Sequence, residues 1–366
     1  MSKKYEVRPY RPWDEEGIVH LLDLSFKGWP NYDLTCSSLD HWKWKFEDNP
    51  LKMFLIVVGI HNNMKISCLH EIPLKIKIGD RFELCNYAAN LAVHPDFRKI
   101  GVSNKMIELM IELRKKAGIQ YVYFVSRNPI VIKSLSKRYY RFPKTVLNLV
   151  KIRDLDLQLQ KMPIKNAWLM KMGFYSARLI NDVRNIILSR ARDRDLRISE
   201  IDHFDERIDE FWEEVSSHYD FIVERNRNYL NWRYCDTRAG GFVVRQAEED
   251  GKVMGYSVLK INRYRSDYPV GFVVDLLSLH DRRDVAEDLA MDAVNYFDRN
   301  KVNIVNYLVI KDHPNVGVFN RLGFLDSRIK PVILYLGHEL NKIKTTSANR
   351  VHFSYGDIDS LPTSLQ

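Results

Sequence analysis

Residues 90–105 read NLAVHPDFRKIGVSNK, in which the apolar run Asn90–Val93 leads directly into a helical pattern. The apolar positions that follow are spaced as on one face of a helix: Met106, Ile107, Leu109, Met110 and Leu113. A strand that turns straight into a helix directs several backbone N–H groups at one point, where the positive end of the helix dipole also lies. The stretch therefore predicts a phosphate or pyrophosphate site, at which Gly101 lets the backbone come close and Arg98 and Lys99 add charge.

This junction resembles the coenzyme A pyrophosphate loop of the GNAT superfamily, the acetyltransferases related to Gcn5. The family pattern is Gln or Arg, two residues, Gly, one residue, then Gly or Ala. Arg98, Gly101 and Ser103 stand at those three positions, so the last departs from the pattern by a hydroxymethyl group. The lead-in 93–97 is also similar, and Tyr139-Tyr140-Arg141-Phe142 resembles the last conserved segment of the family, with Arg141 in place of the usual glycine.

The resemblance implies that acetyl-CoA is the acyl donor. It also implies that the strand carrying Leu91 and Val93 splays away from the strand 122–125. The pantetheine arm of the donor is then expected to pair with the exposed strand backbone in the gap. A backbone N–H near Ala92 is expected to polarise the carbonyl of the thioester. The residues expected to bind the donor are Leu91, Ala92, Val93, Arg98, Lys99, Ile100, Gly101, Val102, Ser103, Asn104 and Asn128. For Ser103, Asn104 and Asn128, capping of a helix or turn is an alternative role.

The candidates for general acid and base are Tyr139, Tyr140 and Glu71. In many members of the family a tyrosine lies five residues before the terminal Phe, but Lys137 stands there in this chain and both tyrosines are shifted. Packing is the alternative role for each tyrosine.

Two further pairs of polar residues are candidates for a base or for binding the acceptor. His70 and Glu71 alternate on one strand, so only one of them can face the cleft, and a satisfied polar pair is the alternative to a base. Glu47 and Asp48 are loop acids that could bind an acceptor amine.

An internal repeat organises the rest of the chain. The segments 39–46 (LDHWKWKF) and 229–234 (YLNWRY) are each followed by two strand-like runs, a third strand, a helical pattern, a short apolar strand and a short helix. The same order of periodicities predicts two copies of one α+β unit. Trp42, Trp44 and Trp232 are expected to lie in the core, with a sugar-stacking surface as the alternative.

The predicted fold class is α+β, with two GNAT-like domains. Each is expected to be a mixed, mainly antiparallel twisted sheet flanked by helices, with a splayed central strand pair. The expected boundaries are 1–150 for the domain with the acyl-CoA loop, 151–196 for a helical connector with a helix over 166–188, 197–340 for a degenerate second domain, and 341–366 for a polar tail that docks through Phe353 and Tyr355.

The second copy is expected not to bind acyl-CoA. Its counterpart of the loop, residues 278–289, has no glycine and places Asp284, Glu287 and Asp288 at the start of the helix. Acids at that position suit the helix dipole and repel pyrophosphate. The second copy is therefore expected to serve packing, to form one wall of the acceptor site, or both.

Composition narrows the class of ligand. The chain has 366 residues and a formal charge of +9, from 56 Lys and Arg against 47 Asp and Glu, which favours anionic ligands. The basic residues are scattered, so nucleic acid is not expected as the main ligand. Four separate cysteines do not predict a metal site, and the longest apolar stretch, 54–60, predicts no membrane span; a cytoplasmic protein is expected.

The sequence thus predicts an acyl-CoA-dependent N- or O-acyltransferase, with acetyl as the expected acyl group and direct attack on the thioester by a small amine or amino sugar. Two other classes remain open. One is a non-catalytic protein that binds acyl-CoA or a partner. The other is an aminoacyltransferase that uses aminoacyl-tRNA, against which the pyrophosphate-type loop argues. The sequence indicates no oligomeric state.

Overall fold

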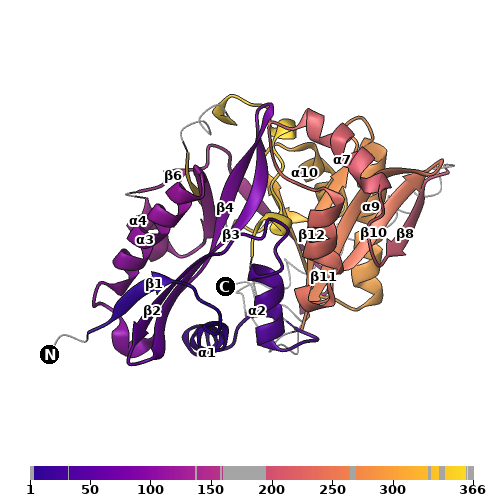
Figure 1. Cartoon of the computed structure of the whole chain (residues 1–366). Coiled ribbons are helices and arrows are strands. Elements are labelled where there is room, and N and C mark those ends of the chain that lie inside the picture. The colour runs from indigo at the N-terminus through magenta and orange to yellow at the C-terminus, as the bar shows by residue number, and fades with distance from the viewer. Residues whose placement is uncertain are drawn as a thin grey trace.

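The structure, a computed structural model, describes residues 4–31, 33–136, 138–156, 159, 195–263, 269–328, 331–337, 343–359 and 361. Figure 1 shows two lobes, each built on a twisted sheet with helices packed against it. Lys137 and the helix expected over 166–188 lie outside the described residues.

The first half follows the order expected from the repeat. Ser37 begins its second helix by accepting a hydrogen bond from the backbone N–H of Asp40 at 3.0 Å, a typical N-cap. Its elements are β1 (Glu6–Pro9), α1 (Glu15–Phe26), α2 (Ser38–Phe46), β2 (Leu55–His61), β3 (Met64–Ile78), β4 (Arg81–Val93), η1 (Pro95–Phe97), α3 (Val102–Lys116), β5 (Tyr121–Ser126), α4 (Pro129–Leu135), β6 (Tyr140–Arg141) and β7 (Val146–Ile152).

The second half repeats this order with its own helices and strands. Its elements are β8 (Arg197–Ile201), α7 (Arg207–His218), β9 (Phe221–Val223), α8 (Arg227–Leu230), η2 (Asn231–Cys235), η3 (Thr237–Ala239), β10 (Val243–Glu249), β11 (Lys252–Asn262), β12 (Val270–Ser278), α9 (Arg283–Arg299), β13 (Ile304–Ile310), α10 (Pro314–Arg321), β14 (Leu325–Asp326), β15 (Val332–Leu336), η5 (Ala348–Arg350) and η6 (Tyr355–Asp357).

Both sheets are mainly antiparallel, with one parallel pair at the centre of each. The first has the order β1-β2-β3-β4-β5-β15-β6, with β9 added to β3, and the second has the order β14-β7-β13-β12-β11-β10-β8. The parallel pairs are β4–β5 and β12–β13. The predicted fold class is therefore confirmed.

The two halves exchange strands. β7, from the first half of the sequence, pairs with β13 over its full length in the second sheet. In the same way β15, from the second half, pairs with β5 in the first sheet. The sheets therefore do not separate at the expected boundary near residue 150, because each central parallel pair is completed by a strand from the other half. The residue limits of the domains stay a prediction.

One large apolar core runs through both halves, and a smaller one lies under α3. The smaller core packs Val102, Met106 and Met110 of α3 against Leu55, Val57 and Leu69 of the sheet. Both faces of the first sheet are buried, one against α3 and the other against the large core. This burial sets the positions of β3 and β4, and with them the positions of the polar residues that these strands carry.

The C-terminal segment 351–359 is packed between the halves rather than extended as a polar tail. Phe353 is 3% exposed and Tyr355 is fully buried, so the expected docking of these two rings is confirmed. Tyr355 packs edge-on against Phe272 and donates a hydrogen bond to Asn148 Oδ1 at 2.8 Å. A bridge between Phe221 and Val351 continues this attachment.

Replacement of Gly356 should test this docking. A Cβ at residue 356 would lie 2.2 Å from the buried hydroxyl of Tyr234, so Gly356→Ala is expected to lower the free energy of unfolding by about 1–3 kcal/mol. Gly317→Ala in α10 is the control, since its Cβ would meet nothing closer than 3.7 Å and alanine favours a helix. Urea denaturation of both variants measures the difference, and equal stability of the two would show that the segment is not seated as described.

Candidate active site between the strands β4 and β5

The central parallel strands separate after three residue pairs. β4 and β5 pair through Cys85 with Tyr121, Asn86 with Val122, and Tyr87 with Tyr123. Beyond this point β4 continues to Val93 and β5 continues to Ser126. β4 carries a bulge between Ala88, which pairs with Glu71 of β3, and Leu91, which pairs with Leu69 of β3. We call the point after Tyr87 and Tyr123 the apex of the V. The expected splayed pair is thus present.

The loop between β4 and α3 leaves the start of that helix without a side-chain cap. Lys99 and Gly101 both have left-handed backbone conformations, with φ of 65° and 87°, and Gly101 is the N-cap residue of α3. A Cβ at Gly101 would have open space, so the requirement for glycine comes from its backbone conformation. The first turn of α3 contains no acid, which leaves its N–H groups suited to an anion.

The predicted donor-binding residues lie along this loop and the free part of β4. Arg98 is exposed and donates from Nε to the carbonyl of Val93 at 3.2 Å. The others divide by exposure: Leu91, Lys99, Ile100, Gly101, Asn104 and Asn128 are exposed, Val93 and Ser103 are half-buried, and Ala92 and Val102 are buried. Because the side chain of Val102 belongs to the core under α3, only its backbone can face a ligand.

Asn128 stands at the start of α4. Its carbonyl accepts from the N–H of Ile132 at 3.0 Å, and its own N–H donates to Ser126 Oγ at 3.1 Å. These bonds place the backbone of Asn128 at the first turn of α4, and the side chain that caps this turn is that of Ser126.

Four polar side chains meet at the apex on the face covered by α3. Glu71 is paired across the sheet with Ala88, the first β4 residue past the apex, and accepts from Asn86 Nδ2 at 2.6 Å. Arg114 of α3 places Nε 3.6 Å from Glu71 Oε2. Tyr139 packs edge-on against Phe124, the first β5 residue past the apex, and contacts the Arg114 guanidinium.

Burial dominates the electrostatics of this cluster. It raises the pKa of Glu71, which Arg114 and Asn86 partly oppose. It also raises the pKa of Tyr139, and there Arg114 acts in the opposite direction while Glu71 adds to the rise. Tyr139 thus stays protonated at neutral pH beside a cation that stabilises its phenolate.

Tyr140 and His70 lie in different surroundings. Tyr140 is 54% exposed and packs on Tyr335. His70 faces the opposite side of the sheet from Glu71, where its Nε2 accepts from Trp42 Nε1 at 3.1 Å and its other edge faces the backbone of Asn90. Burial, reinforced by Lys45, lowers the pKa of His70 to about 3, so this residue is a neutral group.

The two loop acids after α2 are engaged in structural contacts. Glu47 accepts a hydrogen bond from the hydroxyl of Tyr10 at 3.0 Å. Asp48 accepts from Arg238 of the second half at 2.8 Å and so joins the two halves.

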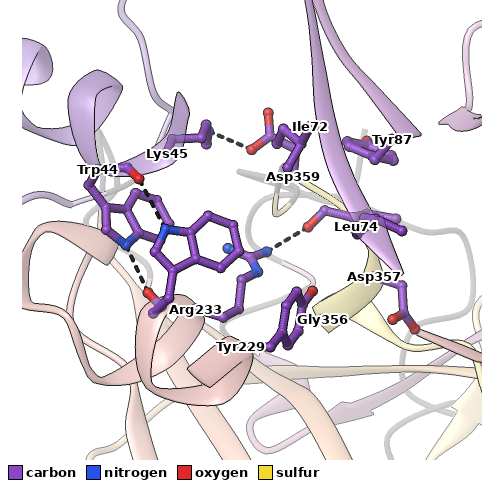
Figure 2. Close-up of a pocket in the computed structure, with 12 residues that line it drawn as sticks. Trp44, Lys45, Ile72, Leu74, Tyr87, Tyr229, Arg233, Gly356, Asp357 and Asp359 are labelled. Carbon is purple, nitrogen blue, oxygen red and sulfur yellow. Dashed lines mark hydrogen bonds and ion pairs between the residues drawn. The ribbon is translucent and has the colours of Figure 1, made fainter. Parts of the chain in front are cut away.

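A pocket lies between the halves, on the face of the first sheet opposite α3 (Figure 2). Its lining includes Ile72 and Leu74 of β3 and Tyr87 of β4, which places one end next to the apex. Trp44 and Trp232 stack at 5.3 Å, and the indole N–H of each donates to the backbone carbonyl of the other, at 2.8 and 3.0 Å. Trp44 is fully buried as expected, whereas Trp232 is half-buried against the core, and the two form a reciprocal pair across the repeat.

The C-terminal segment forms the opposite wall of this pocket. The Lys45 ammonium lies 2.5 Å from Asp359 Oδ1, and Arg233 donates to the carbonyl of Ile358 at 2.8 Å. Each cation directly follows a tryptophan of the reciprocal pair. Burial lowers the pKa of Lys45, and Asp359 opposes that effect.

Sequence reasoning missed the polar residues of the pocket and of the α3 face, namely Lys45, Tyr87, Arg114, Asp357 and Asp359. The repeat could have indicated Lys45, because a basic residue follows the corresponding tryptophan in both copies, Lys45 after Trp44 and Arg233 after Trp232.

The second half does not repeat the open helix start. Arg282 is the N-cap residue of α9 and pairs with Asp284 in the first turn at 3.0 Å. It also pairs with Glu249 of β10 at 2.5 Å. Within the described part of the chain there is no group of three or more His, Cys, Asp or Glu suited to a metal, and no described helix is long and apolar enough to span a membrane.

Comparison with known proteins agrees with this geometry. A family model described as acetyltransferase (GNAT) domain matches residues 6–138. No curated protein sequence matches the chain.

Solved structures resemble the whole chain at low identity. N-myristoyltransferase from Saccharomyces cerevisiae with bound myristoyl-CoA has a TM-score of 0.62 at 11% identity, over 99% of this chain and 86% of that one. A GCN5-related N-acetyltransferase from Anabaena variabilis has a TM-score of 0.58 at 12% identity, over 94% and 75%. A probable N-acyltransferase from Enterococcus faecalis has a TM-score of 0.57 at 11% identity, over 92% and 73%. At such identities the likeness shows a shared two-sheet fold.

The neutral state of His70 predicts a pH dependence of stability. With a folded pKa of about 3 and an ordinary unfolded value near 6.5, the unfolded chain binds more protons below pH 6.5, so His70 destabilises the fold as pH falls. Between pH 7 and pH 5 this one group should account for about 2 kcal/mol of lost stability. Between pH 7 and pH 5, the free energy of unfolding of His70→Gln should fall by about 2 kcal/mol less than that of the parent chain, as measured by urea denaturation. An equal fall in the two proteins would contradict the neutral state of His70.

Proposed function

We propose, from the premise that residues 6–138 are an acetyltransferase (GNAT) domain, that this chain is an acyl-CoA-dependent N-acyltransferase. The observation that carries the proposal is the V between β4 and β5, which opens beside the uncapped N-terminus of α3. Unpaired strand backbone suits the amides of a pantetheine arm, and the helix start suits the pyrophosphate.

In this proposal the pyrophosphate lies on the backbone of residues 99–104, with Arg98 and Lys99 adding charge. The thioester lies at the apex, where backbone N–H groups of β4 past the bulge polarise its carbonyl. The proposed acyl group is acetyl, because the buried ring of Tyr123, whose hydroxyl donates to the Asp357 carbonyl at 2.7 Å, limits the space at the apex.

The proposed acceptor is a small primary amine or an amino sugar that enters the pocket of Figure 2 and attacks the thioester directly. The pocket reaches Tyr87 at the apex from the face opposite α3. Donor and acceptor would then meet at the apex, where direct transfer requires the nitrogen and the carbonyl carbon to be close and aligned. The aromatic walls Trp44, Tyr229 and Trp232 suit a ring or a cation.

Of the candidate catalytic residues, Tyr139 is the one that we assign as the acid for the departing thiolate. It lies at the apex and is protonated at neutral pH, whereas Tyr140 points away. Glu71 is 3% exposed and committed to Asn86 and Arg114, so we assign it a supporting role on the same face.

The donor site is tested by two substitutions in the loop. Arg98→Ala should weaken acetyl-CoA binding by about tenfold or more, since it removes a charge-assisted contact, and Gly101→Glu should abolish binding through strain and repulsion. Gly118→Glu is the control, because Gly118 also has a positive φ and open space but lies at the far end of α3.

Calorimetric titration of acetyl-CoA into the three variants and the parent chain measures the effect. One site per chain is expected, since the start of α9 is occupied by its own ion pairs. No binding to the parent chain at millimolar acetyl-CoA would contradict the proposal and bring forward a partner-binding protein or an aminoacyl-tRNA-dependent enzyme.

The acceptor site is tested by filling the pocket. Ile72→Phe adds volume next to Tyr87, so thiol release from acetyl-CoA with a mixture of primary amines should fall by about tenfold or more. Acetyl-CoA affinity, measured by calorimetry on the same variant, should stay within about twofold. Equal loss of both would place the pocket outside the acceptor path or show that the fold has changed.

A further inference from the structure

Arg114 stands where the sequence pattern of α3 calls for an apolar residue. The inward face of this helix carries Val102, Met106 and Met110, and Arg114 continues that row at a spacing of four. It is 6% exposed, whereas Lys115 and Lys116 in the same last turn are exposed and can serve the helix dipole. Because a buried guanidinium is costly unless it is well satisfied, its presence on this face requires an explanation.

The partners of Arg114 do not fully satisfy it. Its contact with Glu71 is 3.6 Å, long for a hydrogen bond, and among the described residues its Nε is a buried donor without a hydrogen-bond partner. Glu71 in turn is held by Asn86 at 2.6 Å, a much closer contact. An arginine chosen for stability alone would be expected to meet the carboxylate in a close two-point contact.

The place of Arg114 in the V supplies that explanation. Glu71 lies opposite Ala88 and Tyr139 lies on Phe124, so the guanidinium that interacts with both is next to the first residues of β4 and β5 beyond their last shared pair. This is the point at which the proposed function puts the sulfur of the thioester. The charged groups that act on Tyr139 are Arg114 from α3, Glu71 from β3 and Arg138 from its own segment.

We propose that Arg114 is a positioning residue for acyl transfer: it holds Tyr139 at the apex and stabilises the phenolate that forms when Tyr139 protonates the thiolate of coenzyme A. The inference rests on the proposed function and adds to it a residue on the leaving-group side. Glu71, itself held by Asn86, lies 3.6 Å from the guanidinium and supplies the opposite charge beneath α3.

The neutral amine of the acceptor attacks the carbonyl carbon, a C–N bond forms, the C–S bond breaks, and the electron pair leaves on sulfur. The proton of the Tyr139 hydroxyl moves to sulfur to give the free thiol, while the acceptor nitrogen releases one proton to water. The phenolate, held beside the cation of Arg114, then regains a proton from water.

A double-mutant cycle tests whether Arg114 acts through Tyr139. With acetyl-CoA and the amine mixture, Tyr139→Phe should lower kcat about 100-fold and Arg114→Met about tenfold, each with KM for acetyl-CoA within about twofold. The double variant should be no slower than Tyr139→Phe, since the charge has no phenolate left to stabilise. A double variant slowed by the product of the two effects, about 1000-fold, would overturn the proposal.

The charge is tested separately from the packing. Arg114→Lys should recover most of the activity lost in Arg114→Met, and Arg245→Met is the matched control, because it removes an arginine paired with Asp292 in the second half. Removal of the cation raises the pKa of Tyr139. In Arg114→Met, the decrease of kcat at alkaline pH should therefore begin at a higher pH. The pH-independent value of kcat should also be lower than in the parent chain. An unmoved limb, or Arg114→Lys as slow as Arg114→Met, would contradict the assignment.

A readout without the acceptor separates this inference from the proposed function. The ultraviolet phenolate titration, taken as the difference between each protein and its Tyr139→Phe derivative, should shift to higher pH in Arg114→Met. If acetyl-CoA does not bind the parent chain, the proposed function fails. If acetyl-CoA binds and the amine mixture releases thiol, but the Tyr139 titration is the same with and without Arg114, only the role of Arg114 fails.

Discussion

The fully buried guanidinium of Arg225 holds the C-terminal segment to the second half. It lies 2.8 Å from Asp275 of β12 and 2.5 Å from Asp357 of the segment, and all three side chains are excluded from solvent. Asp275 also accepts from Tyr256 and Ser354, each at 3.0 Å. Removal of Arg225 would leave two buried carboxylates without their shared cation, so the network favours one position of the segment. The pocket wall at Asp357 and Asp359, and the contact that closes the apex at Tyr123, both follow from that position.

The two faces of the first sheet divide the chemistry at the apex. Alternation along β3 and β4 places Glu71 and Asn86 under α3, and Ile72 and Tyr87 toward the second half. The face under α3 holds a buried acid, a cation and a phenol, which suit the leaving thiolate. The opposite face holds aromatic rings and the C-terminal carboxylates Asp357 and Asp359, which are paired with Arg225 and Lys45. In the proposed function, the leaving group and the nucleophile would therefore approach from different faces of one sheet and meet at the gap between β4 and β5.

Local patterns predicted most of the fold because each depends on near neighbours in the chain. The junction 90–105, the order of strands and helices in both copies and the buried tryptophans all follow from period, turn residues and helix-start chemistry. The exchange of β7 and β15 could not be predicted in this way. Either strand is apolar enough to complete either sheet, and the choice depends on where the connecting segments lead.

The candidate site shows the same division. The loop with Arg98 and Gly101 is a local motif, so its residues could be named from the sequence; their binding role stays a prediction. Lys45 with Asp359, and Glu71 with Arg114, are far apart along the chain, and no periodicity pairs them. The sequence by itself determined the repeat, the α+β class and the strand-to-helix junction at 90–105, because these are set by local backbone and hydrophobic patterns. Only the tertiary structure decided which tyrosine lies at the apex and that the C-terminal segment walls the pocket, because buried charges must find their partners wherever the fold brings them together.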